Sequence, residues 1–159
     1  MIENYRRWFT YEKDAHRLTL DSLTRLDASQ RSSPSFQKAV DLLAHVIAAR
    51  RMWLFRFGAA SENVELFPKD VRLESLPPLM EQMERQWSNY LNTLTDPEIE
   101  EVFEYTSYEG KRFRNSIDDI LTQLFGHSWY HRGQIAALVR AIGGEPAVTD
   151  FVYWAREPV

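Results

Sequence analysis

The sequence predicts an all-α protein, a four-helix bundle, on the strength of three observations. Only 6 Gly and 7 Pro occur in 159 residues, and they lie mostly between long segments of helical character. Within those segments, apolar residues recur at helical spacing. One shorter stretch before the last long segment instead has the pattern of a β-hairpin. We therefore expect four long helices and one short hairpin.

The first two helices are predicted by apolar stripes and by the residues that end them. The first runs from about Ile2 to Leu26, and the cluster Ser32–Ser35 breaks the chain after it. The second runs from about Ser35 to Phe57, and Gly58 suits its C-terminal end. Their apolar faces are formed by Tyr5, Phe9, Leu20 and Leu23 in the first and by Val40, Leu43, Ile47 and Leu54 in the second.

Residues 58 to 74 are expected to form a connecting loop. The dipeptide Pro77-Pro78 suits the first turn of a third helix, since proline needs no hydrogen-bonded amide there. This helix is expected to end near Leu94, before Thr95-Asp96-Pro97. Between Glu101 and Arg114, two short strand-like runs flank Tyr108-Glu109-Gly110, which predicts a hairpin with a glycine-containing turn.

The fourth helix is the longest and has clear signals at both ends. Ser116, followed three residues later by Asp119, resembles a capping box. The helix is expected to run to about Ile142, where Gly143-Gly144 would end it and Pro146 would prevent its continuation. The aromatic tail Asp150–Trp154 is expected to pack back on the body as one or two helical turns.

Composition limits the function. Residues 1–159 fit one domain with its own core. The net charge is −4 and no basic block is present, so nucleic acid is not an expected partner. Neither a signal peptide nor an apolar run of ~18 residues is visible, so we expect a soluble cytoplasmic protein that does not bind membranes. Cysteine is absent, which excludes a thiolate metal site and a cysteine nucleophile.

The most informative stretch contains two of the four histidines. His127 and His131 are four residues apart in the fourth helix, so they share one helix face. Neutral imidazole is a common ligand of zinc, nickel, copper and iron. His45 lies midway along the second helix, and bundles commonly build metal sites from facing helices. Apolar neighbours suggest that all three point inward, where a shared ion would satisfy them and leave a fourth position open.

Each of these residues also has a plainer interpretation. A lone His-x-x-x-His pair is often a surface feature, and a single His45 on an apolar face is often a buried histidine with a hydrogen-bond partner. His16 is better explained as a hydrogen-bonded or partly exposed histidine than as part of the pocket. Gln123 and Asp41 each precede a candidate ligand by one turn, so they could orient it or serve as a weak fourth ligand.

The C-terminal stretch resembles a known family. From His127 to Ile135 the chain reads HSWYHRGQI, and this run, with the residues after it, resembles the signature of the DinB (DinB/YfiT-like) family. His45 lies where that family places its first metal-binding histidine. The resemblance extends over the whole chain, and its specific part is the C-terminal stretch with the further positions Leu138, Arg140, Gly143, Pro146 and Asp150.

The resemblance implies an up-down-down-up four-helix bundle that binds a divalent metal, usually zinc or nickel, through His45, His127 and His131. It also implies a homodimer, because many members dimerise. Relatives with established activity are S-transferases or isomerases that use low-molecular-weight thiols such as bacillithiol or mycothiol, and others are described as metal-dependent hydrolases. The chain departs at Gln123, where many relatives carry a further histidine, so any role of that imidazole is in doubt.

Three hypotheses of function follow. In the first two the protein is an enzyme with a small-molecule substrate, and in the third it catalyses no reaction. The first is a thiol-dependent S-transferase, which must borrow its sulfur because the chain has no cysteine. Arg140 and Arg132 are candidate anchors for an anionic cofactor, and aromatic side chains could wall its pocket. The second is a hydrolase in which the ion activates water and Glu12 or Asp41 is the base. The third is a non-catalytic metal-binding stress protein. The candidate aromatic residues are Trp53, Trp87, Tyr90 and Trp129, with ordinary core packing as the alternative for each.

Overall fold

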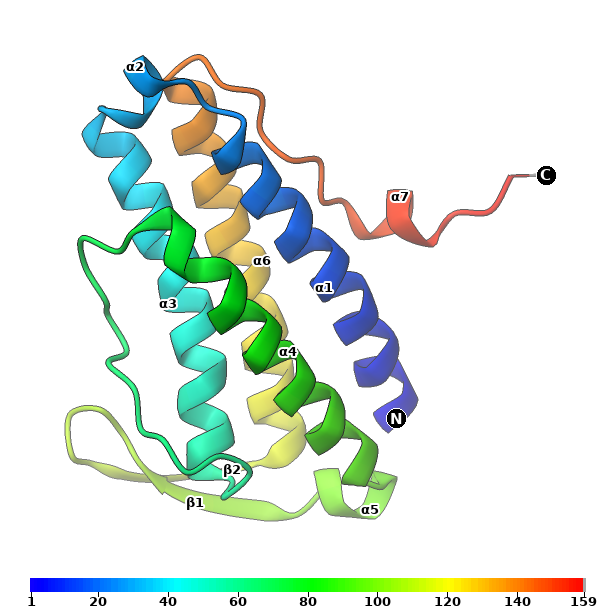
Figure 1. Cartoon of the computed structure of the whole chain (residues 1–159). Helices are drawn as coiled ribbons and strands as arrows, with labels where there is room; N and C mark the ends of the chain where they lie inside the picture. Colours follow the sequence, from blue (N-terminus) through cyan, green and yellow to red (C-terminus); the bar gives the residue numbers. More distant parts are fainter. Residues whose placement is uncertain (159) are drawn as a thin grey trace.

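A computed structural model describes residues 1–158, and this part of the chain is mostly helical with a short hairpin before a long helix, as expected (Figure 1). It holds seven α-helices rather than four, and one short 3-10 helix, η1 (Leu73–Ser75). No helix within this range is long and apolar enough to cross a membrane. The four long helices are α1 (Ile2–Thr24), α3 (Pro34–Arg56), α4 (Leu76–Thr93) and α6 (Ile117–Ala141).

The predicted helix ends agree with the structure to within about two residues. At the start of α3, the Ser33 side chain accepts a hydrogen bond from the Ser35 amide and Pro34 occupies the first turn. At the start of α6, Ser116 and Asp119 form the predicted capping box. Gly143 follows α6 with a φ of 76°, a conformation that favours glycine at the end of a helix.

Two short helices were missed by the sequence analysis. Both α2 (Ala28–Arg31) and α5 (Asp96–Ile99) are four residues long and begin with a capping box. In α2 the pair is Asp27 and Gln30, and in α5 it is Thr95 and Glu98. A single helical turn is too short for apolar periodicity to detect. The helical turn expected in the tail is present as α7 (Phe151–Ala155).

The predicted hairpin consists of β1 (Val102–Thr106) and β2 (Arg112–Ser116), which pair antiparallel with Phe103 opposite Asn115. Gly110 in its turn has a φ of 82°, which a residue with a side chain rarely adopts. The hairpin lies across the end of the molecule where α3 ends and α6 begins (Figure 1).

The core forms where α3 packs on α4 and α6, and α1 packs on the same two helices. Trp87 of α4 is fully buried, and its indole N–H donates to the carbonyl of Arg50 on α3 at 3.0 Å. The largest enclosed apolar side chains come from all four long helices and, for Ile99, from α5: Leu23, Leu43, Leu54, Leu76, Met83, Trp87, Leu91, Ile99, Leu121, Leu124 and Phe125.

The segment between α3 and η1 runs back along the outer side of α3 (Figure 1). Asp41 on α3 fixes its far end, because the carboxylate accepts hydrogen bonds from the amides of Asp70 at 3.2 Å and Val71 at 3.0 Å. The Gln37 side chain donates to the same carboxylate and to the carbonyl of Val71. These bonds bring residues 66 and 67 against the middle of α3.

Candidate metal centre

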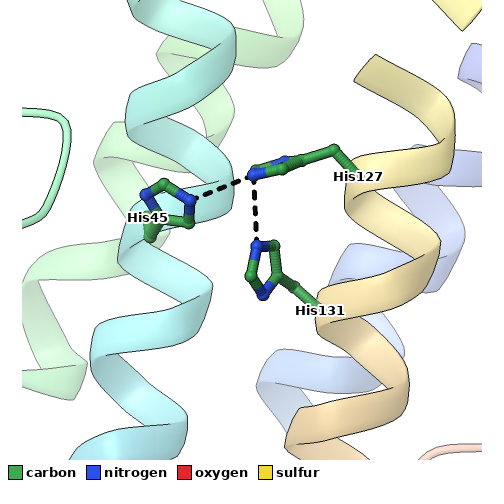
Figure 2. Close-up of side chains that lie close together, drawn as sticks. All are labelled: His45, His127 and His131. Carbon is green, nitrogen blue, oxygen red and sulfur yellow. Dashed lines mark hydrogen bonds between the residues drawn. The ribbon is translucent and has the colours of Figure 1, made fainter. Parts of the chain in front are cut away.

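Three histidines from two helices converge beside this segment. His45 projects from α3, and His127 and His131 project from successive turns of α6 (Figure 2). The Nε2 atom of His127 lies 3.0 Å from Nε2 of His45 and 3.1 Å from Nε2 of His131. All three imidazoles are partly buried. The predicted set of histidines is therefore brought together.

Hydrogen bonds on the opposite ring nitrogens determine where the protons lie. Nδ1 of His45 is 2.6 Å from the carbonyl oxygen of Leu66, which can only accept. Nδ1 of His131 is 2.7 Å from the side-chain oxygen of Gln134. Both Nδ1 atoms therefore carry the proton, and Nε2 of His45 and of His131 presents a bare lone pair.

The three facing Nε2 atoms have too few protons between them, and a metal cation would compensate for the missing protons. A neutral His127 has one ring proton, so it can donate to at most one of the two facing nitrogens. The other contact places two lone pairs about 3 Å apart with no proton between them. Tetrahedral coordination at ~2.0–2.1 Å would place two ligand nitrogens about 3.3 Å apart. The donor set therefore fits a metal ion that binds imidazole nitrogen.

The local electrostatics keep two of the ligands neutral. Burial, which is the largest cause, and the neighbouring His131, His45 and Arg50 together lower the pKa of His127 to about 4. Burial also lowers the pKa of His131, partly offset by its hydrogen bond to Gln134. Since only neutral imidazole can bind a metal, these two side chains are in the ligand form near neutral pH.

An aromatic side chain covers one face of the site. The ring of Phe67 stacks on the imidazole of His45, with ring centroids 4.9 Å apart and planes 11° from parallel. The ring of Tyr108, in the turn of the hairpin, meets Phe67 edge-on at 5.7 Å. Both aromatic side chains are more than half exposed. The loop and the hairpin turn thus form an outer wall beside His45.

An open cavity of about 500 Å³ reaches His45 and His131 from the solvent. This volume is within the usual range for a small-molecule site. The three-histidine group therefore has an accessible side, as the prediction of an open coordination position requires.

Two other predicted residues lie in the core rather than at this site. His16 is fully buried, with Nε2 3.8 Å from Glu12 and Nδ1 3.6 Å from Glu84, and burial lowers its pKa well below the usual value. His16 therefore lies outside the three-histidine group, as expected, but the expectation that it is hydrogen-bonded or partly exposed was wrong. Arg132 is also buried: its Nη1 lies 3.6 Å from Glu12 and its Nη2 donates to the hydroxyl of Tyr11. It is neither solvated nor placed to anchor a ligand.

The remaining candidates lie away from the imidazoles or have other partners. Trp129 is 43% exposed, and its ring meets that of Trp8 of α1 edge-on at 6.1 Å. Arg140 is exposed in the last turn of α6, and Gln123 is exposed one turn before His127. The other aromatic candidates pack in the body, with the alternative of core packing confirmed for Trp53, Trp87 and Tyr90.

The features that the sequence analysis missed are those that support the histidines. Gln134, three residues after His131, was visible only as part of the resemblance to a family. The carbonyl of Leu66 and the ring of Phe67 are contributed by a loop without regular structure. A backbone carbonyl leaves no signal in a sequence, so the partner of His45 could not be found there.

The fold and the site define a helical protein with a three-histidine group positioned to hold a metal ion. The family model described as DinB family matches residues 1–158. The chain belongs to the DinB family, as its C-terminal stretch predicted. Comparisons with curated proteins and with solved structures found no match.

Proposed function

We propose that this protein holds a divalent zinc or nickel ion on His45, His127 and His131 and uses it in S-transfer from a low-molecular-weight thiol. The observation that carries the proposal is the convergence of three Nε2 atoms beside an open cavity that His45 and His131 line. With the ion bound, a thiol that reaches it would have its pKa lowered. The chain has no cysteine, so the sulfur must come from a small molecule.

Backbone and side-chain groups of the chain orient the ligands. The carbonyl of Leu66 accepts a hydrogen bond from Nδ1 of His45, and the side-chain oxygen of Gln134 accepts one from Nδ1 of His131. The Nε2 lone pairs of both histidines are thereby left free to bind the ion. Burial keeps His127 and His131 neutral. Phe67 stacks on one face of the His45 imidazole.

Thiol transfer is favoured over hydrolysis because the two candidate bases have other partners. The carboxylate of Asp41 accepts hydrogen bonds from two loop amides and from Gln37. Glu12 is fully buried and pairs with Arg50 and Arg132. A thiol activated by the ion needs no such base, whereas activation of water for hydrolysis commonly uses one.

Further parts of the proposal rest on family membership. We propose that the four long helices form an up-down-down-up bundle, that the protein is a cytoplasmic homodimer, and that Arg140 and Trp129 contact the thiol cofactor. Both side chains are exposed and therefore available to a ligand or to a second subunit.

Metal content tests the site first. We expect about one zinc or nickel ion per chain in the purified protein, and little in His45→Ala or His127→Ala. The matched control is Gln123→Ala, an exposed position one turn before His127, which should keep the ion. A His45→Ala variant that retained full metal content would contradict the site.

Activity is then tested by conjugation of an electrophile, 1-chloro-2,4-dinitrobenzene, with cysteine, bacillithiol or mycothiol. Turnover that requires both the ion and one of the thiols supports S-transfer. Metal-dependent cleavage of an ester with no thiol present would instead assign the protein to the hydrolases. Metal binding without either reaction would leave the non-catalytic alternative.

A further inference from the structure

The cavity at the histidines has an apolar wall and a cationic rim. Its apolar surface comes from Leu42 of α3 and from Phe67 and Pro68 of the loop. Lys38 and Lys69 line the same cavity, one from α3 and one from the loop. A ligand in this cavity can therefore contact both apolar side chains and ammonium groups.

The two lysines are available to a ligand. The chain has only four lysines, and two of them line this one cavity. Both are exposed, and the ion pairs found within residues 1–158 involve neither of them. Asp41 also borders the cavity, and its carboxylate accepts hydrogen bonds from three amide groups but forms no ion pair with either lysine. The cavity lining thus carries two ammonium groups and one carboxylate, an excess of positive charge.

The spacing along α3 gives the size of the ligand. Lys38 precedes His45 by seven residues, two helical turns, which is ~10 Å along the axis. Both side chains lean toward the N-terminus of the helix, so the distance between their tips stays similar. A chain of about eight carbons extends over this length.

We infer that this cavity binds an amphipathic anion, with its apolar body against Leu42 and Phe67 and its carboxylate between Lys38 and Lys69. The inference rests on the proposed function in one respect: the opposite end of the ligand is taken to face the three histidines. It specifies the substrate class of that site: an elongated apolar molecule of about eight carbons with a terminal acid.

Two probes of equal length test the charge preference. These are 8-mercaptooctanoic acid and 8-mercapto-1-octanol, which differ only in carrying a carboxylate or a hydroxyl. Binding is measured by calorimetry on the full chain, both metal-loaded and metal-free. We expect the acid to bind about 5- to 10-fold more tightly than the alcohol in both forms, with a preference that falls as salt is added.

The variant Lys38→Gln/Lys69→Gln should lose this preference and bind the alcohol as the wild type does. The matched control is Lys13→Gln/Lys111→Gln, which removes the same charge from other surfaces and should keep the preference. Equal affinity for the two probes, or no binding of either, overturns the inference. Metal content, measured separately, distinguishes that result from failure of the proposed function: a charge preference in a protein without metal affinity contradicts only the metal site.

Discussion

Glu12 and Arg50 form an ion pair inside the helical core, where their side chains are 0% and 1% exposed. The guanidinium of Arg50 also lies over the rings of Phe9, Trp87 and Phe125, at 4.7 to 5.3 Å from their centroids. Arg132 approaches the same carboxylate from α6. A single carboxylate on α1 therefore compensates one arginine on each of two other helices.

Removal of this carboxylate should destabilise the protein strongly. Glu12→Gln leaves two buried arginines without a counter-charge, and loss of one partner of a buried ion pair costs about 3–5 kcal/mol. We expect a loss of about 3 kcal/mol in the free energy of unfolding, measured by urea denaturation. Glu81→Gln, at an exposed ion pair on α4, should change it little. Equal stability of Glu12→Gln and wild type would refute the role assigned to this pair.

The loop anchored by Asp41 should control metal affinity without contacting the ion. In Asp41→Ala, the amides of Asp70 and Val71 lose their acceptor, so hydrogen exchange in the loop should accelerate. The carbonyl of Leu66 would then hold His45 less firmly, and loss of such a partner weakens metal binding by roughly 10-fold.

The measurements for this loop are exchange detected by mass spectrometry and metal affinity by competition with a chelator. Glu74→Ala is the control, because Glu74 is exposed in η1 at the end of the same connection. Faster exchange combined with unchanged metal affinity would show that the loop does not hold His45 in place.

Glu84 should make stability depend on pH. Burial raises the pKa of Glu84 to about 7, with Lys13 opposing the shift and Glu12 adding to it. A carboxyl with a pKa near 4.5 in the unfolded chain thus binds its proton more tightly when folded, so the folded state loses stability as pH rises from about 4.5 to 7. The full shift corresponds to roughly 3 kcal/mol, and solvent at one edge of the carboxyl reduces this to about 2 kcal/mol.

The test compares wild type with Glu84→Gln in urea at pH 5 and at pH 8. The variant has no such proton, so its stability relative to wild type should rise by about 2 kcal/mol between the two pH values. A constant difference across this range would mean that Glu84 has an ordinary pKa.

The long helices could be predicted because each has many residues and a clear end. In α6, the capping pair Ser116 and Asp119 and the terminal Gly143 bounded a segment of 25 residues. The four-residue helices α2 and α5 offered only a capping box each. Propensity and periodicity sum over a window, and a single turn is shorter than that window.

The candidate site was also predictable only in part. The shared helix face of His127 and His131 follows from their spacing alone, whereas the addition of His45 depended on its place in a second helix of an expected bundle and was supported by the resemblance to a family. The partners of Glu12 were invisible, because Arg50 and Arg132 reach it only through the packing of three helices. Spacing predicts which residues of one helix are neighbours, and it contains no information about contacts between helices.

Leu66 and Phe67 are adjacent in the loop, yet one holds the proton of His45 and the other walls the cavity. A molecule in the cavity that stabilises the position of Phe67 should also stabilise the neighbouring carbonyl of Leu66, which orients His45. A molecule that displaces Phe67 should make the position of this carbonyl less fixed. If the three histidines hold an ion, we expect ligand binding in the cavity and binding of that ion to be linked equilibria. By thermodynamic reciprocity, the factor by which a ligand changes affinity for the ion is the factor by which the ion changes affinity for that ligand.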